Sequence, residues 1–152
     1  MSNATYSADG VVLGNTYDKY NTRNPVARLL MRGFQRNLDD LLESTDPQSL
    51  LDLGCGEGVL TQRWAKRLAP ARVVGVDLDD PEIAAEWAKR GEPNLEYIAH
   101  RAEHLPFADG EFDVVTATEV LEHVPNPAHT LAEMVRCAQR HVLISVLSLI
   151  HI

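Results

Sequence analysis

The sequence has little cysteine, a deficit of basic side chains and no long apolar stretch. Among 152 residues there are two cysteines, Cys55 and Cys137, and neither belongs to a metal-ligand spacing. We therefore expect neither a disulfide framework nor a bound metal. No apolar run approaches the roughly 20 residues of a membrane span, and the beginning lacks the basic and apolar regions of a signal peptide. These absences predict a cytoplasmic protein that does not contact a membrane.

The deficit of basic residues also bears on the partners. The chain has 14 Lys and Arg against 22 Asp and Glu, a formal net charge of −8. Tight binding to nucleic acid depends on neutralising phosphates with basic side chains. We therefore expect no nucleic-acid partner.

The composition is that of an ordinary globular protein, and strand-like and helix-like patterns of apolar residues alternate along the chain. Residues 1–24 are polar and without a sustained period, and we expect them to be mobile. From Pro25 the apolar residues recur at three- and four-residue steps, which predicts a helix that stops at Thr45, Asp46 and Pro47. The predicted domain spans residues 25–146, and residues 147–152 form an atypical tail.

Beyond residue 48, short apolar runs alternate with helical patterns. The predicted strands are 49–53, 72–76, 95–99, 112–116 and 141–146, and the predicted helices are 59–68, 81–90 and 127–138. Strands separated by helices imply right-handed crossovers. The sequence thus predicts an α/β fold with a Rossmann-like parallel sheet, five strands and helices on both faces.

One segment combines glycines with carboxylates where the first strand gives way to a helix. It reads Leu50-Leu51-Asp52-Leu53-Gly54-Cys55-Gly56-Glu57-Gly58, and Asp77 ends the next strand. Glycines let the backbone turn sharply and approach a ligand closely. An acidic residue at the end of the second strand accepts hydrogen bonds from ribose hydroxyls in nucleoside-binding folds. The pattern predicts a nucleoside site at the carboxyl edge of the sheet.

The carboxylates also discriminate between cofactors. A pyrophosphate requires amide donors without competing negative charge, whereas Asp52 and Glu57 flank these glycines. They suit a ligand that carries an ammonium and a sulfonium, and the G-x-G-x-G spacing departs from the G-x-G-x-x-G of dinucleotide sites. A nicotinamide-dependent oxidoreductase is therefore disfavoured. The alternative is a tight turn whose acidic neighbours are merely solvated.

Four segments in order, LLDLGCGEG, VVGVDLD, AEHLPFADGEFDVV and ATEVLEHV, resemble the motifs of class I S-adenosylmethionine-dependent methyltransferases. The resemblance implies that S-adenosyl-L-methionine is the cofactor and S-adenosyl-L-homocysteine the product. It further implies roles for the matching residues. They would be the loop residues Asp52, Gly54, Cys55 and Gly56 at the methionine part, Asp77 at the ribose, Leu78, Ala102 and Glu103 at the adenine, and Thr118 and Glu119 near the sulfonium.

The chain departs from this family at the adenine. Members often read G-D-A before the E-x-L-P-F segment, and that Asp accepts a hydrogen bond from the adenine amino group. This chain has Arg101 there, and a guanidinium has no acceptor. Either backbone groups read the adenine, or Glu103 does.

Two further features concern the reaction. His123 follows the fourth predicted strand and could act as a general base, or it could order the loop before Pro125. Tyr20, with Tyr17, resembles the tyrosine-rich segment that folds over the cofactor in this family, where an aromatic ring attracts a sulfonium. Helix packing is the alternative for both tyrosines.

Class I methyltransferases usually continue into two further strands, and this chain stops after the fifth predicted one. We therefore expect a truncated core, with an exposed apolar strand edge that favours self-association. The leading hypothesis is a methyltransferase acting on a small-molecule acceptor that the sequence does not identify. The alternative is a non-catalytic, cofactor-binding scaffold domain.

Overall fold

The computed structural model describes residues 5–6, 12–13 and 25–146. Most of the segment predicted to be mobile, Tyr20 with Tyr17, and the tail 147–152 lie outside the described residues. The chain divides into two compact units, Met1–Asp46 and Pro47–Ile152, and each is described by itself.

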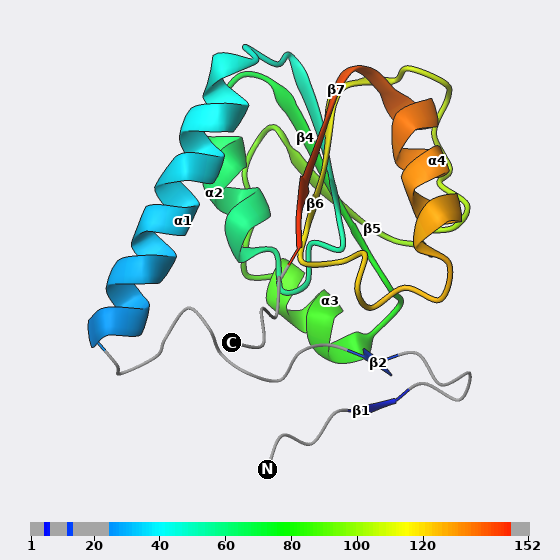
Figure 1. The fold of residues 1–152 in the computed structure, drawn as a ribbon, viewed down its shortest axis with the longest axis horizontal. Helices are drawn as coiled ribbons and strands as arrows, with labels where there is room; N and C mark the ends of the chain where they lie inside the picture. The colour runs from blue at the N-terminus through cyan, green and yellow to red at the C-terminus, as the bar shows by residue number, and fades with distance from the viewer. Residues whose placement is uncertain (1–4, 7–11, 14–24, 147–152) are drawn as a thin grey trace, which may run out of the picture. The chain divides into compact units, whose positions relative to one another are not determined.

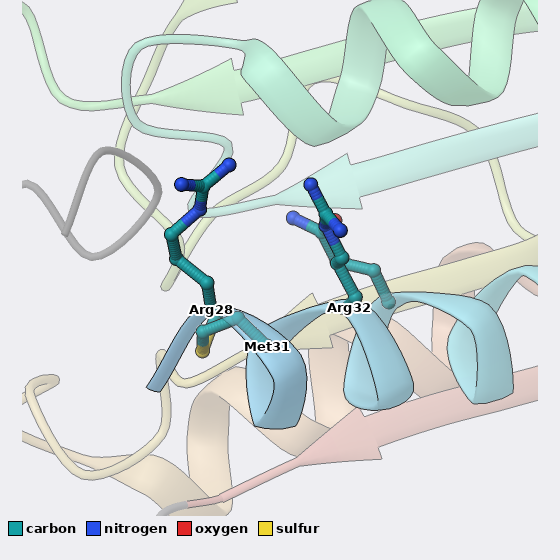
Figure 2. A pocket seen from close by; sticks show the side chains of 4 residues that line it. Arg28, Met31 and Arg32 are labelled. Carbon is teal, nitrogen blue, oxygen red and sulfur yellow. The ribbon is translucent and has the colours of Figure 1, made fainter. Parts of the chain in front are cut away.

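The first unit contains two short strands and one long helix. Strands β1 (Thr5–Tyr6) and β2 (Val12–Leu13) pair antiparallel, and helix α1 spans Pro25–Ser44 as its apolar periodicity predicted. Arg28, Met31, Arg32 and Gln35 line a shallow hollow on α1 (Figure 2). Arg28 and Arg32 are four residues apart, so they rise from the same side of the helix.

The second unit is a three-layer α/β unit built on a five-stranded sheet in the order β5-β4-β3-β6-β7. Every neighbouring pair in this sheet is parallel. Its strands are β3 (Ser49–Leu53), β4 (Arg72–Asp77), β5 (Leu95–Ala99), β6 (Phe112–Thr118) and β7 (Ala138–Ser145). Helix α2 (Val59–Arg67) lies against one face of the sheet and α4 (Pro127–Cys137) against the other (Figure 1). The predicted fold class is thereby confirmed.

The element boundaries differ from the predicted ones by two or more residues at three places. Helix α3 spans Pro81–Trp87 and stops three residues early, because the N–H groups of Lys89 and Arg90 bond to carbonyls three residues back and close a tight turn. Strand β7 begins at Ala138, directly after α4, and β6 continues to Thr118. The extension of β6 brings two further residues to the carboxyl edge of the sheet.

Side chains alternate between the two faces of the sheet, and this alternation places the core and the polar residues. The face toward α4 buries an apolar cluster whose members include Leu51, Leu53, Val74, Val76, Val115, Ala117 and Met134. The alternating positions face α2, where Trp64 and Ala65 are buried. Asp52, Gly75 and Thr116 also fall on the α2 face. The polar side chains of the central strands therefore gather on one side, beneath the glycine loop.

Candidate functional site

The strand register brings the predicted site residues to one edge of the sheet. Leu53, the last residue of β3, is level with Val76 of β4 and Ala117 of β6. The next residues along, Asp77 and Thr118, therefore stand at the carboxyl ends of the strands on either side of the turn that leaves β3. In an open parallel sheet the ligand crevice lies at this edge, where neighbouring connections diverge to opposite faces.

The turn after β3, residues 54–58, is called the glycine loop below. It folds across the end of β4, because the N–H groups of Gly54 and Cys55 both donate to the Val76 carbonyl, at 2.8 and 3.1 Å. The N–H of Gly58 donates to the Cys55 carbonyl, and Gly58 is then the N-cap of α2 with φ of 78°. The loop is thus a compact turn that delivers the chain into a helix at the carboxyl edge.

Gly54, Gly56 and Gly58 all have positive φ, yet their surroundings differ. A Cβ at Gly54 would lie 2.4 Å from Val120, and one at Gly58 would lie 2.4 Å from the Tyr97 hydroxyl. A Cβ at Gly56 would meet nothing within 4 Å. Two of the glycines therefore make room for neighbouring side chains, whereas Gly56 borders open space that a ligand can occupy.

Asp77 is bound to the glycine loop. Its Oδ2 accepts from the N–H of Gly56 at 2.6 Å, and its Oδ1 accepts from the N–H of Leu78 at 2.7 Å. Burial raises the pKa of Asp77 above its usual value, and these two donors oppose that rise. Each carboxylate oxygen keeps a further lone pair, so the group retains capacity to accept from ligand hydroxyls.

Asp52 lies below the loop, almost fully buried at 3% exposure. Thr61 of α2 donates to its Oδ2 at 2.6 Å, and Thr116 of β6 donates to its Oδ1 at 3.1 Å. Burial raises the pKa of Asp52 to about 7, because the hydrogen bonds offset the desolvation only in part. The sequence did not single out these threonines, although the alternation of side chains along β6 puts Thr116 on the same face as Asp52.

Three side chains that sequence reasoning did not assign to the site hold the loop from behind. Trp87 Nε1 donates to the Gly56 carbonyl at 2.8 Å and Arg90 Nε to the Glu57 carbonyl at 2.8 Å. The Tyr97 hydroxyl donates to the Gly58 carbonyl at 3.0 Å. Trp87 also stacks on the ring of Tyr97. Nothing in the apolar periodicity reveals where an indole N–H points.

The end of β6 lies at the same sheet edge, on the other side of β3 from Asp77 and β4. Glu119 has φ of 56°, a conformation that non-glycine residues rarely adopt and that clusters at functional sites. Its N–H donates to the Ser145 carbonyl of β7. Val120 follows and fills the space left by Gly54. His123 is exposed in the next turn, where its N–H donates to the Val120 carbonyl.

The residues predicted for the adenine lie in the connection after β5. The N–H of His100 donates to the Asp77 carbonyl, which ties the start of this connection to β4. Ala102 packs against the apolar cluster on the α4 face. Glu103 lies 3.8 Å from the exposed Arg101 guanidinium. Neither Ala102 nor Glu103 forms a hydrogen bond or an ion pair with the described residues of the glycine loop.

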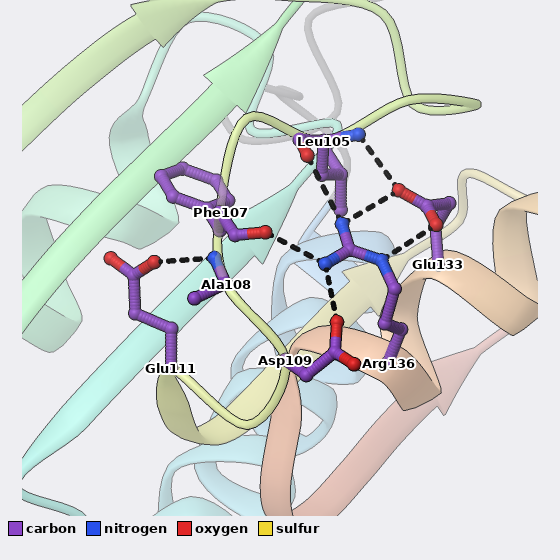
Figure 3. Close-up of polar contacts among 7 residues, drawn as sticks. All are labelled: Leu105, Phe107, Ala108, Asp109, Glu111, Glu133 and Arg136. Atoms are coloured by element: carbon purple, nitrogen blue, oxygen red, sulfur yellow. Dashed lines mark hydrogen bonds and ion pairs between the residues drawn. The ribbon is translucent and has the colours of Figure 1, made fainter.

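Arg136 of α4 anchors the rest of that connection (Figure 3). Its guanidinium donates to the carbonyls of Leu105 and Phe107 and pairs with Glu133 and Asp109 at 2.8–3.0 Å. Glu133 in turn accepts from the N–H of Leu105, and these contacts lower its pKa to about 2. The connection is therefore held by charge-assisted bonds to α4.

Among the described residues, no three His, Cys, Asp or Glu side chains gather as metal ligands would. None of the described helices is both long and apolar enough to cross a membrane.

Comparison with known proteins identifies the family. A family model described as "Methyltransferase domain" matches residues 51–145, well over half of the chain. The chain belongs to this methyltransferase family. The matched region runs from β3 to the end of β7 and includes the glycine loop, Asp77 and the end of β6. The predicted class of fold and its cofactor, S-adenosyl-L-methionine, are thereby confirmed.

Curated relatives of this methyltransferase domain extend well beyond it. A protein of Aromatoleum aromaticum named ubiquinone biosynthesis O-methyltransferase is 41% identical over 93 residues, which are 59% of this chain and 38% of that protein. The yeast relative, from Saccharomyces cerevisiae, is named ubiquinone biosynthesis O-methyltransferase, mitochondrial, and is 35% identical over 67% of this chain and 33% of its own. The chain thus spans less than half the length of these relatives.

Solved structures match the fold of this chain, and they include proteins that are named for different reactions. A putative methyltransferase from Bacillus halodurans matches with a TM-score of 0.55 and 27% identity, covering 68% of this chain and 47% of that one. A protein described as the [4+2]-cyclase SpnF matches with a TM-score of 0.59 and 28% identity, covering 71% and 42%. The same fold is therefore found in a protein that is named for a reaction other than methyl transfer.

Proposed function

We propose that this domain binds S-adenosyl-L-methionine at the carboxyl edge of its sheet and transfers the methyl group to a small-molecule acceptor. The observation that carries the proposal is the pairing of Gly56, beside open space, with the Asp77 carboxylate that holds its N–H. The family match over residues 51–145 supports it.

The residues at this edge fit the cofactor. Asp77 would bind the ribose, with Leu78 beside the adenine, and the loop residues Gly54, Cys55 and Gly56 would hold the methionine part. Below the loop, Asp52 would supply negative charge toward the cofactor's ammonium. Ala102 and Glu103 complete the adenine side in the proposal, and Thr118 and Glu119 the sulfonium side. Arg101 near Glu103 favours reading of the adenine by backbone groups.

When bound, S-adenosyl-L-methionine supplies an activated methyl group on a sulfonium. The chain has to hold the acceptor in line, exclude water and receive the acceptor's proton where one is lost. We assign the last role to His123, which is exposed beside the end of β6. A His123→Gln variant should lower the turnover rate and flatten its pH profile while leaving S-adenosylhomocysteine affinity unchanged. An unchanged turnover would show that His123 does not receive the proton and only orders the loop.

The names of the relatives suggest the acceptor class. Those of Aromatoleum aromaticum and Saccharomyces cerevisiae are named as O-methyltransferases of ubiquinone biosynthesis. We therefore place a hydroxyl group of a small molecule first among the acceptors. Transfer of labelled methyl to a panel of hydroxylated aromatic compounds tests this choice.

Binding of S-adenosylhomocysteine, measured by calorimetry beside NAD, tests the cofactor site. The domain should bind the former and not the latter. Asp77→Ala should weaken binding by about 1.5–3 kcal/mol, because it removes charge-assisted hydrogen bonds to the ribose. An unaltered dissociation constant for that variant would remove Asp77 from the site, and binding of NAD alone would refute the proposal.

A second candidate is a domain that binds the cofactor without transferring methyl. The cyclase with the same fold supports this alternative, since its name specifies another reaction. Both candidates bind S-adenosylhomocysteine, so binding does not separate them. Label transfer from S-adenosyl-L-methionine to any acceptor establishes the first.

Three further assignments belong to the proposal. We place the cofactor-binding domain at residues 25–146 and the protein in the cytoplasm, without a nucleic-acid or membrane partner. We also propose self-association through β7, the outer strand of the sheet next to β6. Ile144 near its end and Val146 directly after it are 42% and 55% exposed, which supports a contact between copies.

A further inference from the structure

Three successive carbonyls of the glycine loop accept hydrogen bonds from three different side chains. The donors are Trp87 at the end of α3, Arg90 in the turn after it, and Tyr97 in β5, and together they are called the carbonyl clamp. None of the three is among the residues predicted to touch the cofactor. All three donors reach the loop from α3, the turn after it and β5.

The clamp fixes the direction of the loop amides. A trans peptide unit is planar, so its N–H points opposite to its C=O. Holding the carbonyls of Gly56, Glu57 and Gly58 therefore turns the next three N–H groups, those of residues 57–59, away from the clamp. Without such donors, a glycine-rich loop can rotate its peptide planes at little cost, because glycine has a wide choice of backbone angles.

The surroundings of Tyr97 show that the clamp is built into the packing. Tyr97 stacks on Trp87 with ring centroids 5.1 Å apart and planes 5° from parallel. A Cβ on Gly58 or on Gly75 would lie within 3 Å of the Tyr97 ring or hydroxyl. The ring thus occupies space that these two glycines leave free, and Arg90 is steadied by Glu86 at 3.2 Å.

We propose that Trp87, Arg90 and Tyr97 are positioning residues of the cofactor site, which keep the carbonyls of the glycine loop turned toward α3 and β5 and leave the amides of residues 57 and 59 available to the cofactor, since the N–H of Gly58 is already bonded within the loop. This inference rests on the proposed function. A loop whose peptide planes could flip would present carbonyl oxygens to the cofactor's carboxylate, and the like charges would repel. The clamp removes that alternative before the cofactor binds, which is preorganisation of a binding site.

Conservative variants test the clamp. Tyr97→Phe removes the hydroxyl and keeps the ring, Trp87→Phe removes the indole N–H, and Arg90→Gln removes the guanidinium. Arg72→Gln is the matched control for Arg90, since Arg72 pairs with Glu111 at 2.9 Å at the amino end of β4 and contacts no loop carbonyl. Each clamp variant should raise the dissociation constant of S-adenosylhomocysteine by about threefold to tenfold at a temperature where it is fully folded. Arg72→Gln should not.

A second readout needs no cofactor. Amide hydrogen exchange of residues 54–59 should be faster in the clamp variants and unchanged in Arg72→Gln, because the loop planes are released without unfolding the domain. Clamp variants that are folded, bind like the wild type and exchange no faster would overturn the inference alone. A wild-type domain that does not bind S-adenosylhomocysteine would overturn the proposed function, and the inference with it.

Discussion

At the scale of single residues, Asp52 makes the stability of the unliganded domain depend on pH in an unusual direction. Burial raises its pKa from 3.8 to about 7, so between these values the folded chain holds a proton that the unfolded chain has lost. The free energy of unfolding should therefore fall as the pH rises through this window. Most buried carboxylates that are paired with cations act in the opposite direction.

Chemical denaturation between about pH 5.5 and 7 measures this effect. The wild type should lose on the order of 2 kcal/mol over that interval through Asp52, one pH unit corresponding to about 1.4 kcal/mol. Asp52→Asn stays neutral, and its amide can accept from one of Thr61 and Thr116 and donate to the other hydroxyl, so this variant should lose less stability than the wild type over the same interval. Equal slopes for the two proteins would show that Asp52 is ionised throughout. A cationic ligand group near Asp52 should lower its pKa again, so binding should release a proton.

Comparing Gly56 with Gly110 separates the effect of a side chain in the space beside the loop from the effect of backbone strain. Gly56 and Gly110 both have positive φ, and a Cβ at either would meet no atom closer than 3.9 Å. Gly56→Val and Gly110→Val should therefore cost similar stability, about 1–2 kcal/mol from the left-handed conformation. Calorimetry should show loss of S-adenosylhomocysteine binding for Gly56→Val alone. Equal binding by both variants would make the glycine loop a structural turn.

At the scale of elements, Arg136 joins α4 to the connection that carries Ala102 and Glu103. The guanidinium makes five hydrogen bonds to four residues of this region, and its loss would leave two backbone carbonyls without their donor. Arg136→Met should lower the free energy of unfolding by about 2 kcal/mol in thermal melts. Arg140→Met, an exposed position in β7, is the control. Equal melting temperatures for the two variants would show that the connection does not need this anchor.

The elements were predictable because their signals are periodic. Apolar alternation and helical spacing placed all five strands of the large sheet and helices α1 to α4 to within three residues. Predicting that α3 reaches Arg90 was wrong, because the hydrogen bonds that close its last turn leave no trace in the apolar pattern.

The site could be predicted where backbone geometry requires a residue type. Gly54, Gly56 and Asp77 were predicted because a tight turn needs glycine and a ribose needs an acceptor; the structure places them at one sheet edge, and their roles toward the cofactor stay predictions. Thr61, Trp87 and Tyr97 were not, since their roles depend on where one N–H or O–H group points after folding. Such contacts join positions 9 to 39 residues apart, so no local pattern records them.

At the scale of the whole molecule, the outer strand β7 is the surface through which we expect copies of the chain to associate. Ile144 and Val146 are exposed at an outer strand, and self-pairing there would bury them. Size-exclusion chromatography with light scattering should show a mass that rises with concentration, and Ile144→Lys should abolish the rise. Leu131→Lys, on the exposed side of α4, is the control for added charge. A monomer at all concentrations would remove β7 as a contact surface.

The close fit between Tyr97 and the strand beside it also limits how this domain can change during evolution. Gly75 is the register partner of Tyr97 across β4 and β5, and a Cβ there would come within 2.8 Å of the ring. Alanine at 75 should therefore be destabilising with tyrosine at 97 and less so once a smaller residue stands at 97, where only the contact with Cys55 Sγ at 3.0 Å remains tight. The effects of substitutions at the two positions therefore depend on each other. A lineage that replaces Gly75 first passes through a protein in which the new side chain clashes with the Tyr97 ring. Substitution in the reverse order, Tyr97 before Gly75, gives up the hydrogen bond to Gly58 and the stacking on Trp87, and it removes the clash with a side chain at 75.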